Sequence, residues 1–165
     1  ASWFVENGIV GGIRISTRPD AIDDETLKLL KSYNVTAIEL GAQSMLDSVL
    51  VANHRGHTAD DVRTAARLIK ERGFNLGLQM MTGLYGANEE SDRVTAQKLM
   101  ELNPDTVRIY PTLTLANTYL EELYRKGNYT PPSLDQTVTL CADLLQQFEA
   151  ICHLHHMLLQ LQHHS

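Results

Sequence analysis

The sequence has very little cysteine and no recognisable signal peptide. Only Cys141 and Cys152 occur among its 165 residues, which excludes a disulfide framework. With so few thiols and no signal peptide, the expected location is the reducing cytoplasm. The hydrophobic fraction is 43%, which is typical of a globular chain, so no membrane association is expected.

Positive charge is also scarce. Fourteen Lys and Arg residues stand against twenty Asp and Glu residues, giving a net charge of -6. A protein dedicated to duplex DNA needs a basic stripe that displaces counterions from phosphates, so duplex DNA is not expected as a partner. The common nucleotide and hydrolase motifs, namely a Walker loop, GxGxxG, GxSxG and HExxH, are missing as well.

Strand and helix patterns alternate along the chain, and its length fits one domain, assigned to residues 1–150. Strands are predicted at 12–17, 36–43, 76–82 and 106–112. Helices are predicted at 22–33, 44–53, 58–72, 89–102 and 119–125, and a last one begins near 133 and continues past 148. This alternation predicts four βα units with parallel strands and right-handed crossovers.

The two faces of the predicted sheet differ in polarity. One set of alternating strand residues is apolar and comprises Ile13, Ile15, Ile38, Leu40, Leu76, Leu78, Val107 and Ile109. The other set is mostly polar and comprises Arg14, Ser16, Glu39, Gly41, Gln43, Gln79, Arg108, Tyr110 and Thr112. A doubly wound sheet, the alternative, is covered on both faces and would be apolar on both. The pattern favours an α/β fold in which four βα units form about half of a TIM-like barrel, with helices on the outer face.

A polar barrel interior is costly unless it meets water, a ligand or its own ion pairs. Arg14, Glu39 and Arg108 project from three strands into this interior and form a candidate site. The alternative is a ligand-free network of two arginines and one glutamate that closes the barrel. Active sites of βα barrels lie at the carboxyl ends of the strands, so function is expected there.

Three further motifs carry weaker signals. The Gly83–Gly86 loop either lets backbone amides approach a ligand or is simply a flexible turn. His54 and His57 have no cysteine or further histidine close by in sequence, so they indicate a junction between a helix and a loop, and no metal site is expected. Cys141 and Cys152 are interpreted as buried small hydrophobic residues.

Five collinear blocks are too specific for a generic barrel. They are ISTRPD at 15–20, IELGAQS at 38–44, NHRGHT at 53–58, GLQMMTGL at 77–84 and VRIYPT at 107–112. This series resembles radical SAM proteins, in particular the group of elongator-type tRNA-modifying subunits and oxygen-independent coproporphyrinogen III oxidase-like proteins. The resemblance extends to about residue 150 and implies a partial βα barrel.

The resemblance also implies a set of ligand-binding positions. In that family S-adenosylmethionine is held by positions that match Ser16, Gln43, Arg55 and Gln79. Arg108 and Tyr110 face the same cavity, which together with Arg14 and Glu39 gives the candidate substrate cavity. If this cavity persists, S-adenosylmethionine is expected to bind weakly.

The sequence departs from the family pattern at its chemical centre. The CxxxCxxC loop that holds the [4Fe–4S] cluster is missing, and Cys141 and Cys152 are too far apart to replace it. We therefore expect the cluster only in parent proteins, no cofactor resident in this chain and no catalytic residue. Tyr85 and Tyr119 also replace residues, usually proline, of the family's turns.

The leading hypothesis is a truncated or recombined half-barrel from a radical SAM enzyme, inactive on its own. The alternative is an engineered or selected self-associating unit without a ligand. A split enzyme whose partner supplies the cysteine loop is a third hypothesis. In either of the first two cases a homodimer is expected, through sheet edges, the polar inner face or the terminal helix. Residues 151–165 hold five of the seven histidines and are expected to be a non-native helical tail.

Overall fold

The computed structural model describes residues 1–149 and contains the four predicted strands and all the predicted helices. The strands are β1 (Ile13–Thr17), β2 (Val35–Gln43), β3 (Asn75–Thr82) and β4 (Thr106–Pro111). The predicted helices are α2 (Asp24–Ser32), α3 (Asp47–Ala52), α4 (Ala59–Glu71), α5 (Glu89–Met100), α6 (Tyr119–Arg125) and α7 (Leu134–Glu149). Two short elements were not predicted, α1 (Ser2–Glu6) and the 3-10 helix η1 (Pro19–Ala21). The expected tail at 151–165 lies outside the described residues.

The strands form one parallel sheet in the order β1-β2-β3-β4. Leu40 of β2 pairs with Leu78 of β3, which in turn pairs with Val107 of β4. The spatial order never reverses, as it would in a doubly wound sheet, so each crossover places its helix on the same face. This confirms the predicted arc of a βα barrel.

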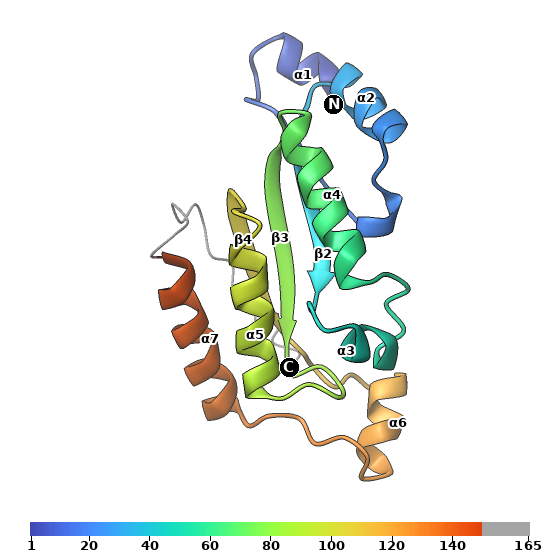
Figure 1. Cartoon of the computed structure of the whole chain (residues 1–165), viewed down its shortest axis with the longest axis vertical. Helices are drawn as coiled ribbons and strands as arrows, with labels where there is room; N and C mark the ends of the chain where they lie inside the picture. The colour runs from blue at the N-terminus through green and yellow to red at the C-terminus, as the bar shows by residue number, and fades with distance from the viewer. Residues whose placement is uncertain (150–165) are drawn as a thin grey trace.

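Helices cover the outer face of the sheet, defined by the alternate residues Ile38, Leu40, Leu76, Leu78 and Met80. All five side chains are completely buried. Helices α4 and α5 lie over this face, and α7 packs beside α5 and β4 (Figure 1). The apolar side of α4 includes three buried alanines, whose small side chains let the helix lie close to the strands. The hydrophobic core therefore lies between the sheet and these helices.

Local sequence signals fix the ends of the helices. Thr58 and Asp61 form a capping box at the start of α4, with reciprocal hydrogen bonds. Gly73 follows the end of α4 with φ at 74°, a left-handed conformation that costs glycine no steric penalty. Asn88 and Ser91 form a second capping box, at the start of α5, that was not predicted.

The opposite, inner face of the sheet carries Ser16, Glu39, Gln79, Arg108 and Tyr110. Glu39 is buried, whereas Gln79, Arg108 and Tyr110 are half-buried and Ser16 is exposed. The polar side chains therefore lie on the face that forms the interior of a βα barrel. In the part of the chain that the structure describes, no helix is long and apolar enough to cross a membrane.

Candidate functional site

The carboxyl edge of the sheet, where the strands end at Thr17, Gln43, Thr82 and Pro111, brings several predicted site residues together. Ser16 lies one residue before the end of β1, and Gln43 is the last residue of β2. Gln79 of β3 pairs with Gly41, two residues before Gln43. Parallel strands end at one edge, so three of the four predicted S-adenosylmethionine positions lie on neighbouring strands in the same region.

Gln43 stands at an irregularity that alternation alone does not reveal. The register shifts between Gly41 and Gln43, and the φ of Gln43 is 64°, in the left-handed region that non-glycine residues rarely adopt. A Cβ at Gly41 would lie only 2.8 Å from Gln43 Nε2. Because Gly41 has no side chain, the amide group of Gln43 occupies the space beside it on the inner face. Backbone strain of this kind is common at functional sites.

Arg55 reaches the site from the loop between α3 and α4. The His57 ring lies with Nε2 3.1 Å from the carbonyl oxygen of Ala42, a hydrogen bond that fixes this loop to β2. The Nε of Arg55 is buried and has no hydrogen-bond partner within residues 1–149. Burial, and then the nearby charge of Arg18, lower the pKa of Arg55. A desolvated donor without an acceptor fits an anionic ligand group.

Arg55 also lines a cavity of about 320 Å³, the Arg55 cavity, at the same end of the molecule. Its walls are largely apolar and include Met81, Leu113 and Leu123, with Thr112 at the end of β4. Tyr119 closes one side, where its ring stacks at a tilt against His54 with centroids 5.4 Å apart. Ser16, Gln43 and Gln79 are not among its lining residues. The structure therefore brings Arg55 and these three to one end of the sheet without placing them around a single cavity.

Two of the four residues predicted for the substrate cavity, Glu39 and Arg108, form an ion pair. Arg108 Nε lies 3.0 Å from Glu39 Oε1, and Glu39 is only 1% exposed. The approach has the distance of an ion pair but not the direction of a hydrogen bond, since Oε1 accepts none. Ser16 Oγ donates to Glu39 Oε2 at 3.4 Å, and Arg108 Nη1 donates to Tyr110 Oη at 3.5 Å. The bond to Tyr110, and secondarily the charge of Glu39, raise the pKa of Arg108.

Arg14 stands apart from this pair. It pairs in register with Ala37, in the first half of β1, and its side chain is exposed. The alternative prediction was a network of Arg14, Glu39 and Arg108. The structure contains the pair of Glu39 with Arg108 but does not include Arg14 in it. Gly77 makes room for the Glu39 side chain, because a Cβ at position 77 would lie 3.1 Å from Glu39 Cγ.

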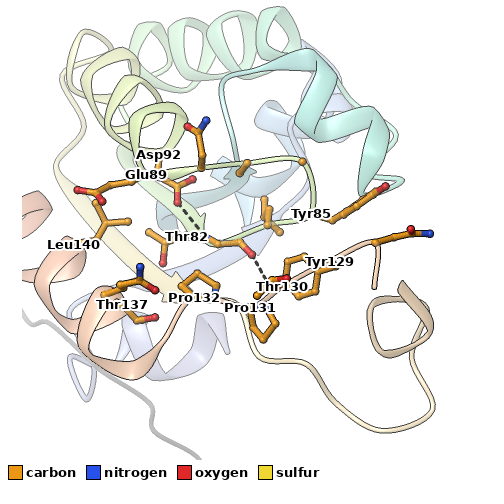
Figure 2. A pocket seen from close by; sticks show the side chains of 17 residues that line it. Thr82, Tyr85, Glu89, Asp92, Tyr129, Thr130, Pro131, Pro132, Thr137 and Leu140 are labelled. Atoms are coloured by element: carbon orange, nitrogen blue, oxygen red, sulfur yellow. Dashed lines mark hydrogen bonds between the residues drawn. The ribbon is translucent and has the colours of Figure 1, made fainter. Parts of the chain in front are cut away.

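A second cavity of about 510 Å³, the Asp92 cavity, was missed by the sequence analysis. Asp92 of α5 is 4% exposed, and its Oδ2 accepts a 2.9 Å hydrogen bond from the Gly83 amide (Figure 2). Tyr129 Oη donates to the Gly83 carbonyl at 2.8 Å. Both backbone groups of Gly83 are thus engaged by the protein, and its amide is not free to approach a ligand. The sequence did contain a signal for the burial of Asp92, because it lies at helical spacing from Thr95, Ala96 and Leu99, which are buried on the same side of α5.

The structure describes one of the two thiols, that of Cys141. Cys141 is buried on α7, where burial raises the pKa of its thiol, and Cys152 lies outside the described residues. Within residues 1–149, no three His, Cys, Asp or Glu side chains converge as a metal-binding group. His57 and His54 lie at a junction between a helix and a loop, as predicted.

An arc of parallel βα units with a polar inner face is the architecture of an open βα barrel. Comparison with known proteins assigns this barrel to a family. The profile of the Radical SAM superfamily matches residues 7–99, and that of the Radical_SAM C-terminal domain matches residues 104–165. The chain therefore belongs to the radical SAM superfamily.

Curated relatives agree with the predicted group. The tRNA uridine(34) acetyltransferase of Methanocaldococcus jannaschii is 30% identical over 129 residues, which cover 76% of this chain and 24% of the relative. Elongator complex protein 3 of Schizosaccharomyces pombe is 37% identical over 130 residues, which cover 74% of this chain and 24% of that protein. The chain thus spans about a quarter of the length of these two relatives.

Solved structures show the same fold. Elp3 of Methanocaldococcus infernus with an N-terminal deletion superposes with a TM-score of 0.83 at 24% identity, covering 91% of this chain and 36% of that one. The radical SAM enzyme coproporphyrinogen III oxidase of Escherichia coli gives a TM-score of 0.69 at 19% identity, covering 84% and 32%. Both likenesses confirm the partial barrel, of which this chain forms only a part.

Proposed function

We propose that this chain forms part of the S-adenosylmethionine-binding wall of a radical SAM barrel and carries out no radical chemistry alone. The observation that supports this most is Arg55, whose buried Nε has no acceptor within residues 1–149 and which lines a cavity next to the ends of β3 and β4. S-Adenosylmethionine carries a carboxylate, and a guanidinium is the side chain best suited to bind one.

The other residues of the proposed site contribute hydrogen bonds. Gln43 and Gln79 offer amide donors and acceptors, and the strained backbone at Gln43 holds its amide over Gly41. Ser16 already donates to Glu39, so its oxygen remains as an acceptor. Arg108 and Tyr110 lie on the same face, where Arg108 pairs with Glu39 and donates a hydrogen bond to Tyr110.

When it is bound in radical SAM enzymes, the [4Fe–4S] cluster supplies the electron that cleaves S-adenosylmethionine to a 5′-deoxyadenosyl radical. The residues of this sequence do not fit that cluster, because it has two cysteines rather than a CxxxCxxC loop. We therefore assign no step of the reaction to this chain. Its role is to bind and orient a ligand.

Calorimetric titration of the chain with S-adenosylmethionine tests this proposal. We expect weak binding, and we expect Arg55→Met to reduce the affinity about tenfold or more because a charge-assisted hydrogen bond is lost. Arg63→Met, the same change at an exposed arginine of α4, is the matched control and should bind like the parent chain. No binding by the parent chain, or equal binding by both variants, would contradict the proposal.

A self-associating fold without a ligand is the second candidate function. It is favoured by one observation, namely that β1 and β4 form the two edges of the described sheet. We propose that two copies associate through these edges or through their inner faces. A dimer mass in light scattering is expected, and a monomer mass across a wide concentration range would contradict it.

A further inference from the structure

The Asp92 cavity lies on the helix-covered side of the sheet end and shares two lining residues, Leu84 and Tyr85, with the Arg55 cavity. Its walls come from the loop that follows β3, the first turns of α5 and the segment from Asn128 to Leu140. None of the eight site residues predicted from the sequence lines it. Its volume of about 510 Å³ falls in the range of small-molecule sites.

Asp92 places a buried carboxylate in this cavity. One oxygen is held by the Gly83 amide, and no ion pair to Asp92 occurs within residues 1–149. Burial raises the pKa of Asp92 to about 6, and the nearby charge of Glu89 adds to this, whereas the bond from Gly83 opposes it. Near pH 8 the carboxylate is ionised and has no positive partner.

Among the residues that the structure describes, none supplies a positive charge that would neutralise Asp92. No described residue that lines the cavity is Lys, Arg or His. Arg93, the next residue of α5, instead pairs with Glu89 and Asp143, each at 2.7 Å. Tyr129 lines the cavity, and Cys141 follows the lining residue Leu140 on α7. Burial raises the pKa of both, so neither gains charge near neutral pH.

Aromatic and apolar groups form the side opposite the carboxylate. The rings of Tyr85 and Tyr129 meet edge to face with centroids 6.3 Å apart, while Pro131 and Pro132 lie beside them (Figure 2). Aromatic faces attract cations as well as apolar bodies. The cavity thus combines a desolvated negative charge at one end with aromatic walls at the other.

We propose that the Asp92 cavity binds a small organic cation, a primary ammonium group on an apolar body, with the ammonium on Asp92 and the body against Tyr85 and Tyr129. An ammonium supplies the hydrogen-bond donors and the countercharge that Asp92 lacks. Of the three residues named for this site, only Tyr85 also lines the Arg55 cavity.

Calorimetric titration of the full chain with phenethylamine at pH 8 tests the proposal. The neutral analogue 2-phenylethanol should bind about tenfold more weakly or worse, and 3-phenylpropionate should not bind, because only the amine offsets the carboxylate. At pH 5 Asp92 is mostly protonated, so the affinity for phenethylamine should fall about tenfold. Equal binding of amine and alcohol, or no binding of either, would overturn the proposal.

Two variants and a control assign the binding to this cavity. Asp92→Asn keeps an oxygen for the Gly83 amide but removes the charge, and it should abolish the preference for the amine. Thr137→Trp fills the cavity from α7 and should block binding without touching Asp92. Glu90→Gln removes a charge from the exposed side of α5 and should bind like the parent chain. If both cavity variants, checked for folding by circular dichroism, retain the parent's preference, the proposal is wrong.

Discussion

The two faces of one sheet differ in what their residues do. On the outer face, Leu78 is completely buried beneath helices. On the inner face, its neighbour Gln79 is half-buried and polar. The first face holds the apolar contacts that favour folding, because burial of apolar area is the main driving force. The second tolerates polar groups that add little to stability and are available for binding. Stability and ligand binding should therefore respond to substitutions on opposite faces.

The largest difference in stability should be between substitutions at two neighbouring residues of β3. Leu78→Ala leaves a cavity in the core and should lower the free energy of unfolding by about 3 kcal/mol. Gln79→Ala should change it by less than about 0.5 kcal/mol. Urea denaturation of the two variants measures both, and similar losses would show that the inner face also supports the fold.

Asp92 is a charged exception on the helix-covered side, and it gives stability a pH dependence. Its pKa is raised from 3.8 to about 6, so its contribution is most favourable below pH 4 and is lost as the pH rises through 6. Asp92→Asn should therefore stabilise the chain by up to about 3 kcal/mol at pH 8, with little gain at pH 4. Denaturation at both pH values measures this, and a pH-independent difference would contradict the assignment.

The buried ion pair on the inner face should have an intermediate effect. Arg108→Met leaves Glu39 buried without its cation and should cost about 2 kcal/mol, less than for a fully buried pair because Arg108 is partly exposed. Adding Glu39→Gln should recover most of this loss. Thermal or urea denaturation of the single and double variants tests the coupling, and additive losses would mean that the two groups do not interact.

The smallest effect on stability should come from Arg55. Arg55 is half-buried and its Nε makes no hydrogen bond to any residue from 1 to 149, so Arg55→Met should change the free energy of unfolding by less than about 0.5 kcal/mol. The same variant should lose affinity for S-adenosylmethionine. A large loss of stability, measured by urea denaturation, would instead identify Arg55 as a structural residue.

Periodicity in the sequence was enough to predict the strands, the main helices and the polarity of each face. Alternation places Leu78 and Gln79 on opposite faces whatever lies around them, so local pattern and structure agree. The capping box at Thr58 and the left-handed Gly73 could also be read directly, because their signals lie within a few residues. By contrast, the five residues of α1 bury nothing and carry no periodic pattern.

The details of the site depend on contacts between distant segments, which the sequence pattern does not contain. Arg14 and Arg108 look equivalent in alternation, but only Arg108 reaches Glu39. The register shift at Gln43 changes the direction of one side chain without changing its neighbours in sequence. Asp92 resembles the other acidic residues at the start of α5, and only the fold shows that it is buried.

The most direct test of the account is a nitrogen-15 NMR titration of the labelled chain with S-adenosylmethionine. The account predicts shifts at the amides of Ser16, Gln43, Arg55 and Gln79, while Asp92 and the residues of α5 stay unchanged. Shifts confined to the Asp92 cavity, or no shifts at saturating ligand, would contradict the central claim that the inner face at the carboxyl edge is the binding surface.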